Sequence, residues 1–309
     1  MDIVTIIIII LGLCLFEIIS SIDNAIINAE VLSTMGQRAR RWFLVWGILI
    51  AVFVIRGFLP WLIVWAVNPG LGPLGSLTAT FSSDPSVKHY IEQSAPILLA
   101  GGGIFLVFLF LHWLFLEDKH FGLPRAEKFF LQQGVWFYAI VSLILTVIVW
   151  QAINTDKLMA LGAVIGSTAF FITHGFKQNA EENEKKLLSS NLTDISKIFY
   201  LEIIDATFSI DGVLGAFAFT MSIPLILLGN GLGAIVVRQL TIKGIDKIKK
   251  YVYLKNGAMY SIFILGAIMI LRAFGCSVPE LVSPVATFLV VGYFFYKSTL
   301  AMKAKTSNN

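Results

Sequence analysis

Apolar windows long enough to cross a membrane recur along almost the whole chain, and they constrain its fold more than any other feature. A helix that crosses the ~30 Å hydrocarbon core of a bilayer needs roughly 20 mostly apolar residues. The composition agrees, because 57% of the residues are hydrophobic and 14% are charged, and the mean hydropathy is +0.82. We therefore expect an all-α integral membrane protein with about nine transmembrane helices. The predicted windows are 3–34, 43–67, 95–116, 134–153, 158–175, 198–221, 224–242, 253–274 and 281–302.

Two segments depart from a simple span. The first window, 3–34, is too long for one straight crossing, so we expect it to be tilted, broken near Ser20 to Asp23, or extended beyond the membrane. The stretch 68–94 is rich in Gly, Pro and Ser, which predicts an irregular loop. Its role stays open.

Lys and Arg residues cluster after every odd-numbered window, whereas the even-numbered connections hold little beyond Lys88, Lys157 and Arg272. By the positive-inside rule, the N-terminus lies outside and the C-terminus is cytoplasmic. The same spacing shows that the net charge of +4 marks topology rather than a nucleic-acid surface, so the expected surroundings are a lipid bilayer. The clusters are Arg38, Arg40, Arg41; Lys119, Arg125, Lys128; Lys177, Lys185, Lys186, Lys197; Lys243, Lys247, Lys249, Lys250; and Lys303, Lys305.

An acidic motif interrupts the first window and recurs later in the chain. Glu17 and Asp23 lie six residues apart, as do Asp205 and Asp211, and in both copies Ser-Ile precedes the second acid. Under the predicted topology the two copies run in opposite directions through the membrane. An inverted-topology repeat with polar interruptions in corresponding helices indicates a transporter site near the bilayer midplane.

The repeat suggests a single polytopic domain over 1–309 with internal halves. Residues 1–153 form the first repeat half, 154–197 form a linking span and cytoplasmic linker, and 198–309 form the second half.

The side chains of the two motifs are suited to binding a hard cation. Glu17, Asp23, Asp205 and Asp211 are the candidate primary ligands, and Asn24, Ser21 and Ser209 are the candidate secondary ligands. Carboxylate, amide and hydroxyl oxygens are ligands for Mn²⁺, Ca²⁺ or Mg²⁺, whereas zinc and copper sites usually recruit Cys or His. The alternative is that these acids are hydrogen-bonding groups that join helices.

Charge balance adds further candidates. Four carboxylates around one divalent ion leave excess negative charge, so some must be protonated, paired with Arg, or shared with a second ion. Competition between protons and metal suggests proton-coupled exchange as a hypothesis. Arg56, inside the second window, is the candidate counter-charge, with a side chain reaching the membrane interface as the alternative. Whether Glu30 and Glu202 join the site stays open.

The two motifs also carry a family resemblance. The chain resembles the TerC family within the LysE-like transporter superfamily, in a subgroup of unknown function. Its E-x5-D-N element matches Glu17, Asp23 and Asn24, and its D-x5-D element matches Asp205 and Asp211. The resemblance implies manganese efflux and divalent-metal homeostasis.

These observations together predict a transporter that exports divalent cations, Mn²⁺ preferred, across the bacterial cytoplasmic membrane. We expect no enzymatic activity and no resident cofactor, because the sequence shows neither a nucleophile-base arrangement nor a nucleotide motif. Two alternatives stay open: an exporter of small organic cations or amino acids, and a membrane scaffold that assists the metalation of secreted proteins. The coupled ion, its stoichiometry and the oligomeric state stay open as well.

Overall fold

The computed structural model describes residues 2–47, 50, 56–67, 69–79, 85–189, 193–243 and 248–307, and the side chains of most of them. The described residues form helices and connecting turns, with no strand among them. The α-helices are α1 (Ile3–Ser20), α2 (Ile22–Ser33), α3 (Gln37–Trp42), α4 (Arg56–Val67), α5 (Gly72–Ala79), α6 (Pro85–Leu116), α7 (Pro124–Gln132), α8 (Phe137–Thr155), α9 (Lys157–Ser189), α10 (Asp194–Ala216), α11 (Ile223–Lys243), α13 (Leu254–Ala273) and α14 (Val282–Ser307). Short helical segments of other types are η1 (Phe43–Gly47), η3 (Pro69–Leu71) and η4 (Gly134–Trp136).

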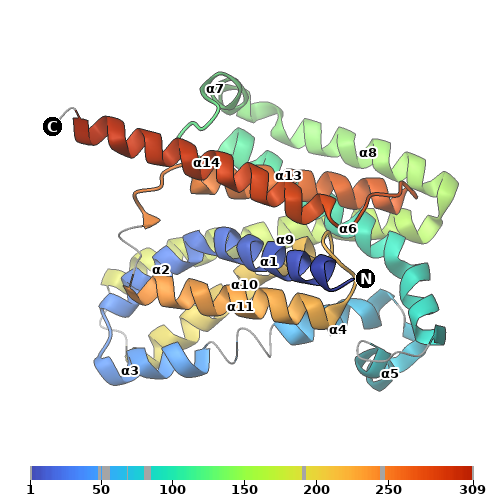
Figure 1. Ribbon diagram of the computed structural model, residues 1–309, viewed down its shortest axis with the longest axis horizontal. Helices are drawn as coiled ribbons and strands as arrows, with labels where there is room; N and C mark the ends of the chain where they lie inside the picture. Colours follow the sequence, from blue (N-terminus) through green and yellow to red (C-terminus); the bar gives the residue numbers. More distant parts are fainter. Residues whose placement is uncertain are drawn as a thin grey trace.

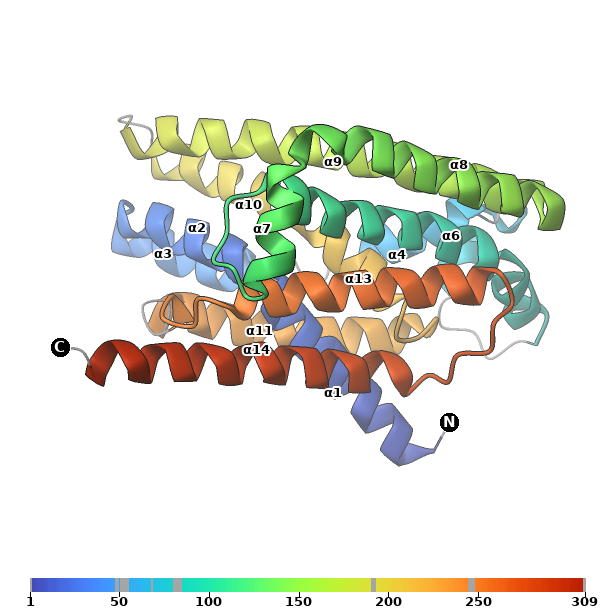
Figure 2. The same ribbon diagram turned by 90° about the horizontal axis from the view of Figure 1, so that it is seen from above.

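Most of the long helices lie roughly lengthwise in one bundle, while the short helix α7 runs crosswise to them (Figure 1). Seen from above, α8 and α9 lie along one edge and α14 along the opposite edge, with α6 and α13 between them (Figure 2). The central place of α6 agrees with burial, because 83% of the window Ser94–Leu116 is buried against 17% of Gly134–Thr155 in α8. The exposed face of α8 carries Leu143, Val147 and Trp150, as expected for contact with lipid.

Among the residues that the structure describes, seven helices are long and apolar enough to cross a membrane, so the all-helical, multi-pass prediction is confirmed at this level. They match seven of the predicted windows. The window 198–221 forms α10, but charged residues such as Glu202, Asp205 and Asp211 leave it short of the apolar character of the others. The window 43–67 lies partly outside the described residues. The described residues thus do not confirm the predicted number of nine spans.

The prediction of an irregular loop over 68–94 is wrong for its described part. Residues 69–71 form η3, α5 follows, and α6 begins at Pro85, nine residues before its apolar window. Proline is favoured at the start of a helix because its fixed φ suits that position and its missing N–H needs no partner there. Gly72 has a φ of +66°, which only glycine adopts easily, and allows the chain to turn into α5.

Glycines bring α9 against the central helix α6. A Cβ atom at Gly166 would overlap the carbonyl oxygen of Gly101, and one at Gly162 would lie 2.5 Å from the carbonyl oxygen of Ile97. Small residues at such crossings allow backbones to approach closely, which is a common way for membrane helices to pack.

Candidate functional site

The first acidic motif lies where α1 ends and α2 begins. The α-helix ends at Ser20 and resumes at Ile22, so the expected break near Ser20 to Asp23 is present. The hydroxyl of Ser21 donates to Oε1 of Glu17 at 2.6 Å, and the Glu17 residue is 1% exposed. The structure therefore holds a carboxylate and a hydroxyl together at this junction.

The second acidic motif lies inside a continuous helix. α10 runs through Asp205 and Asp211 without a break, and both residues are buried. Ser209, also buried, donates its hydroxyl to the carbonyl oxygen of Asp205 at 2.6 Å. Helical spacing places Glu202, Asp205 and Ser209 along one face and turns Asp211 nearly half a turn away from it.

Two contacts join the motifs, and each is the counterpart of the other. The amide of Asn24 donates to Oδ1 of Asp205. A Cβ atom at Gly212 would lie 3.1 Å from Oε2 of Glu17. Asn24 follows Glu17 by seven residues, and Gly212 follows Asp205 by the same seven. Exchanging the two segments therefore converts one contact into the other.

Further contacts extend this antiparallel pairing toward the other end of α2. Nζ of Lys197 donates to Oγ1 of Thr34 at 2.9 Å, and the backbone N–H of Gly36 donates to Oδ2 of Asp194 at 3.1 Å. Residue numbers rise along α1 and α2 as they fall along α10. The pairing thus continues over several helical turns.

Several buried oxygens around this junction have no hydrogen-bond partner among the described residues. They are Oδ1 of Asn24, Oδ1 of Asn28, Oδ1 of Asn230 and both carboxylate oxygens of Glu202. Asn28 lies one turn after Asn24 on α2, and Asn230 of α11 directs its amide to the carbonyl oxygen of Gly212 at 3.5 Å. Buried polar atoms are nearly always paired, so such a concentration is typical of a place that receives an ion or water.

A buried arginine lies beside these oxygens. Arg238 of α11 is 6% exposed, donates to the carbonyl oxygen of Phe43 at 3.3 Å, and stacks over the Phe43 ring. A Cβ atom at Gly47 would touch both Arg238 and Glu202, which places these two side chains against the same glycine. The predicted counter-charge, Arg56, is the first residue of α4, but its side chain lies outside the described residues. The same is true of the Asp23 side chain.

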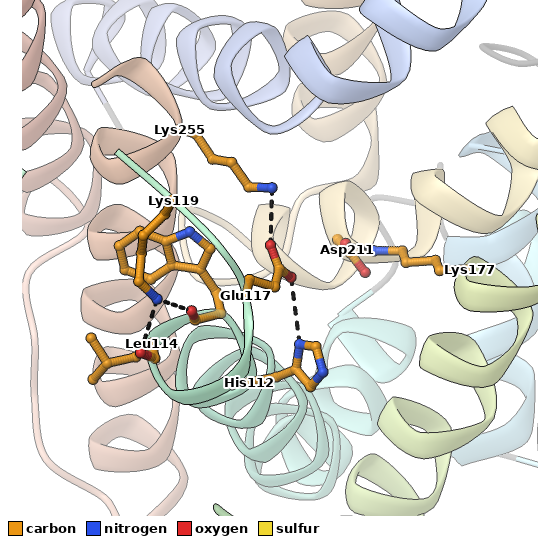
Figure 3. A network of polar contacts seen from close by, with 8 residues as sticks. His112, Leu114, Glu117, Lys119, Lys177, Asp211 and Lys255 are labelled. Carbon is orange, nitrogen blue, oxygen red and sulfur yellow. Dashed lines mark hydrogen bonds and ion pairs between the residues drawn. The ribbon is translucent and has the colours of Figure 1, made fainter. Parts of the chain in front are cut away.

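Asp211 has different neighbours from the other acids. It forms an ion pair with Lys177 of α9. Nearby, Nδ1 of His112 lies 3.4 Å from Oε1 of Glu117, and Nζ of Lys255 lies 2.9 Å from Oε2 of the same residue. Figure 3 shows Glu117 between His112 and Lys255, with the Lys177–Asp211 pair to one side.

Two groups at the end of α6, Glu117 and Lys119, have shifted pKa values. Burial raises the pKa of Glu117, but the neighbouring His112 and Lys255 outweigh burial and bring the pKa to about 2. Burial lowers the pKa of Lys119 to about 8, despite the nearby carboxylates of Glu117 and Glu127. The last carbonyl groups of a helix have no backbone N–H partner within the helix. At the end of α6, Lys119 donates to two of them, the carbonyl oxygens of Trp113 and Leu114.

The predicted site residues thus fall into two groups. Glu17 with Ser21 and Asn24 with Asp205 meet at the α1–α2–α10 junction, with Ser209 on the same face of α10, whereas Asp211 pairs with Lys177. Among the side chains that the structure describes, no three of the His, Cys, Asp and Glu type converge closely enough to hold a metal.

Sequence reasoning did not select Asn28, Arg238 or Lys177 for this site. Two sequence features could have pointed to the first two residues. Asn28 follows Asn24 at i+4 spacing, and Arg238 lies near the end of an apolar window. Lys177 was assigned to a basic cluster that marks topology, and nothing local linked it to Asp211.

A family model described as "Protein of unknown function (DUF475)" matches residues 22–305. No curated protein and no solved structure matches the chain. The assignment to the TerC family and the LysE-like superfamily is therefore wrong, because the family that matches is a different one. Two short acidic elements were too little to define a family, since any membrane protein with paired buried carboxylates can contain them. The match covers most of the chain, and the protein belongs to the DUF475 family.

Proposed function

We propose that this protein transports a divalent metal cation, Mn²⁺ preferred, across the bacterial cytoplasmic membrane in the direction of efflux. The observation that carries the proposal is the group of buried carboxylate and amide oxygens where α1 and α2 meet α10 and α11, several of them without a hydrogen-bond partner among the described residues. Buried polar and ionisable groups between membrane helices are costly, and they commonly mark an ion pathway.

The donor set favours a hard cation. Glu17 and Asp205 supply carboxylates, and Ser21 and Ser209 supply hydroxyls. Asn24 supplies an amide oxygen that has no hydrogen-bond partner in the described part of the chain. Oxygen ligands of this kind suit Mn²⁺, Ca²⁺ and Mg²⁺. The proposal also retains Asp23 and Asp211 as ligands from the sequence and adds the oxygens of Asn28, Glu202 and Asn230.

The exchanged contacts support an inverted repeat. Exchanging the two motifs converts the contact of Glu17 with Gly212 into the contact of Asp205 with Asn24. Such equivalence is expected when two segments are related by an axis in the membrane plane. In this proposal α10 and the window 43–67 complete nine spans, with the N-terminus outside and the C-terminus cytoplasmic. The binding site then lies between two halves that rock to open alternately to each side.

Charge compensation makes proton exchange part of the proposal. Glu17 and Asp205 are buried, the carboxylate oxygens of Glu202 are buried as well, and the buried guanidinium of Arg238 lies beside them. Removing a divalent ion from such a set leaves an excess of negative charge that protons can neutralise.

Flux in proteoliposomes tests the proposal. Wild-type protein is expected to move Mn²⁺, with a rate that follows an imposed pH gradient. Glu17→Gln and Asp205→Asn keep the shape of each side chain and remove its charge, so the flux should fall by at least about tenfold, as for loss of a metal-site contact. The matched controls Glu280→Gln and Asp118→Asn change exposed acids and should retain it. Absence of divalent-cation flux in the wild type would reject the proposal.

A further inference from the structure

The ion pair between Lys177 and Asp211 has features that simple neutralisation of charge does not explain. The two side chains are 13% and 11% exposed, so both charges are largely removed from water. Lys177 contacts Oδ2 of Asp211, while Oδ1 is buried without a hydrogen-bond partner among the described residues. A buried ion pair stabilises a protein well only when its remaining donors and acceptors are also satisfied. Asp211 is therefore only half satisfied in this conformation.

Asp211 lies next to the oxygen cluster along α10. The following residue, Gly212, faces Glu17, and its carbonyl oxygen accepts from Asn230. The Lys177 ammonium thus pairs with the carboxylate of Asp211, the residue next to Gly212, where α1, α10 and α11 meet. Because a lysine ammonium and a divalent cation both seek carboxylate oxygens, they cannot share Oδ2.

Lys177 also has a second carboxylate in its surroundings. Glu117 is near enough to Asp211 for their charges to repel, and it is 31% exposed in contact with Lys255 and His112. Figure 3 shows Glu117, with its partners His112 and Lys255, on the side of Asp211 away from the Lys177 backbone. A lysine side chain is long and flexible, so its ammonium can move without a change in the helices.

We propose that the Lys177 ammonium is a tethered competitor of the transported cation, which holds Asp211 in this conformation and must withdraw before a metal ion can bind there. The inference rests on the proposed function, because it assumes a cation that binds near Asp211. Lys177 then sets the apparent affinity of the site. If the lysine occupies Asp211 most of the time, the site is available in only a fraction of molecules and binding weakens by that fraction.

Calorimetric titration of the full-length protein in detergent with MnCl₂, at fixed pH and ionic strength, tests this inference. Lys177→Met removes the competing charge, and the Mn²⁺ dissociation constant should fall by about tenfold. The matched control Lys249→Met, which removes an exposed lysine paired with Glu30, should leave it unchanged. In the double variant Lys177→Met/Asp211→Asn the gain should disappear relative to Asp211→Asn alone, because the competition acts through Asp211.

A second substitution covers the possibility that Lys177→Met fails to fold with a buried, unpaired Asp211. Lys177→Arg keeps the charge and offers a carboxylate two parallel donors, so it should weaken Mn²⁺ binding several-fold. Unchanged affinity in either folded Lys177 variant, beside a wild type that binds Mn²⁺, would overturn this inference alone. A wild type that binds no Mn²⁺ would instead overturn the proposed function.

Discussion

At the scale of single residues, the decisive feature is how each buried charge is compensated. Glu17 accepts from Ser21, Asp205 accepts from Asn24, and Asp211 pairs with Lys177. The sequence predicts that both acidic motifs form one site, and it includes Ser21 and Asn24, the partners of Glu17 and Asp205, in that site. The lysine partner was not predicted, because an ion pair between residues 34 positions apart depends on how α9 packs on α10.

Glu117 makes a prediction about acid stability. Its pKa is lowered to about 2 in the folded protein from an ordinary value of 4.5, so its contribution to stability is present above pH 4.5 and is lost as the pH falls toward 2. Partial exposure reduces this contribution to about 1–2 kcal/mol. Thermal unfolding in detergent at pH 6 and pH 3 should therefore show a smaller acid-induced loss for Glu117→Gln than for wild type. Equal losses would show that the ion pairs of Glu117 do not stabilise the fold.

At the scale of helices, the length of the apolar windows predicted most of the membrane-spanning helices. Charged residues account for the window that is less apolar than the others. Within the part of the chain that the structure describes, seven windows correspond to helices that can span a membrane, because a long apolar run has few alternatives to a buried helix. α10 lies at the position of the predicted window 198–221, but its charged residues make it less apolar than those seven helices. The Gly and Pro content of the stretch 68–94 predicts a loop, but both residues also begin helices there, at Gly72 and Pro85.

The close packing of α6 and α9 leads to a prediction at this scale. Gly166→Ala places a methyl group on the backbone of Gly101, so the helices must separate, and the protein should lose about 1–3 kcal/mol of stability. Gly175→Ala is a matched control in the same helix, where nothing lies within 4 Å of the added carbon. Thermal unfolding in detergent should show a lower midpoint for Gly166→Ala and no loss for Gly175→Ala. Equal midpoints would contradict the described contact.

At the scale of the whole molecule, the central feature is one junction built from two motifs far apart in the chain. Hydropathy could predict that the motifs lie in helices, and the topology deduced from the Lys and Arg clusters predicted that they run in opposite directions. Only packing gives the pairing of Glu17 with Gly212 and of Asn24 with Asp205. The asparagine and arginine that complete the junction come from α2 and α11, and their roles become visible when these helices are placed beside α10.

The most direct test of a shared site is Mn²⁺ binding to Glu17→Gln, Asp205→Asn and the double variant, measured by calorimetry on the purified protein. If the two motifs form one site, each single substitution should weaken binding by at least about tenfold, and the double variant should bind about as weakly as either one. Unchanged binding in the single variants, or losses that multiply in the double variant as for independent sites, would contradict the account.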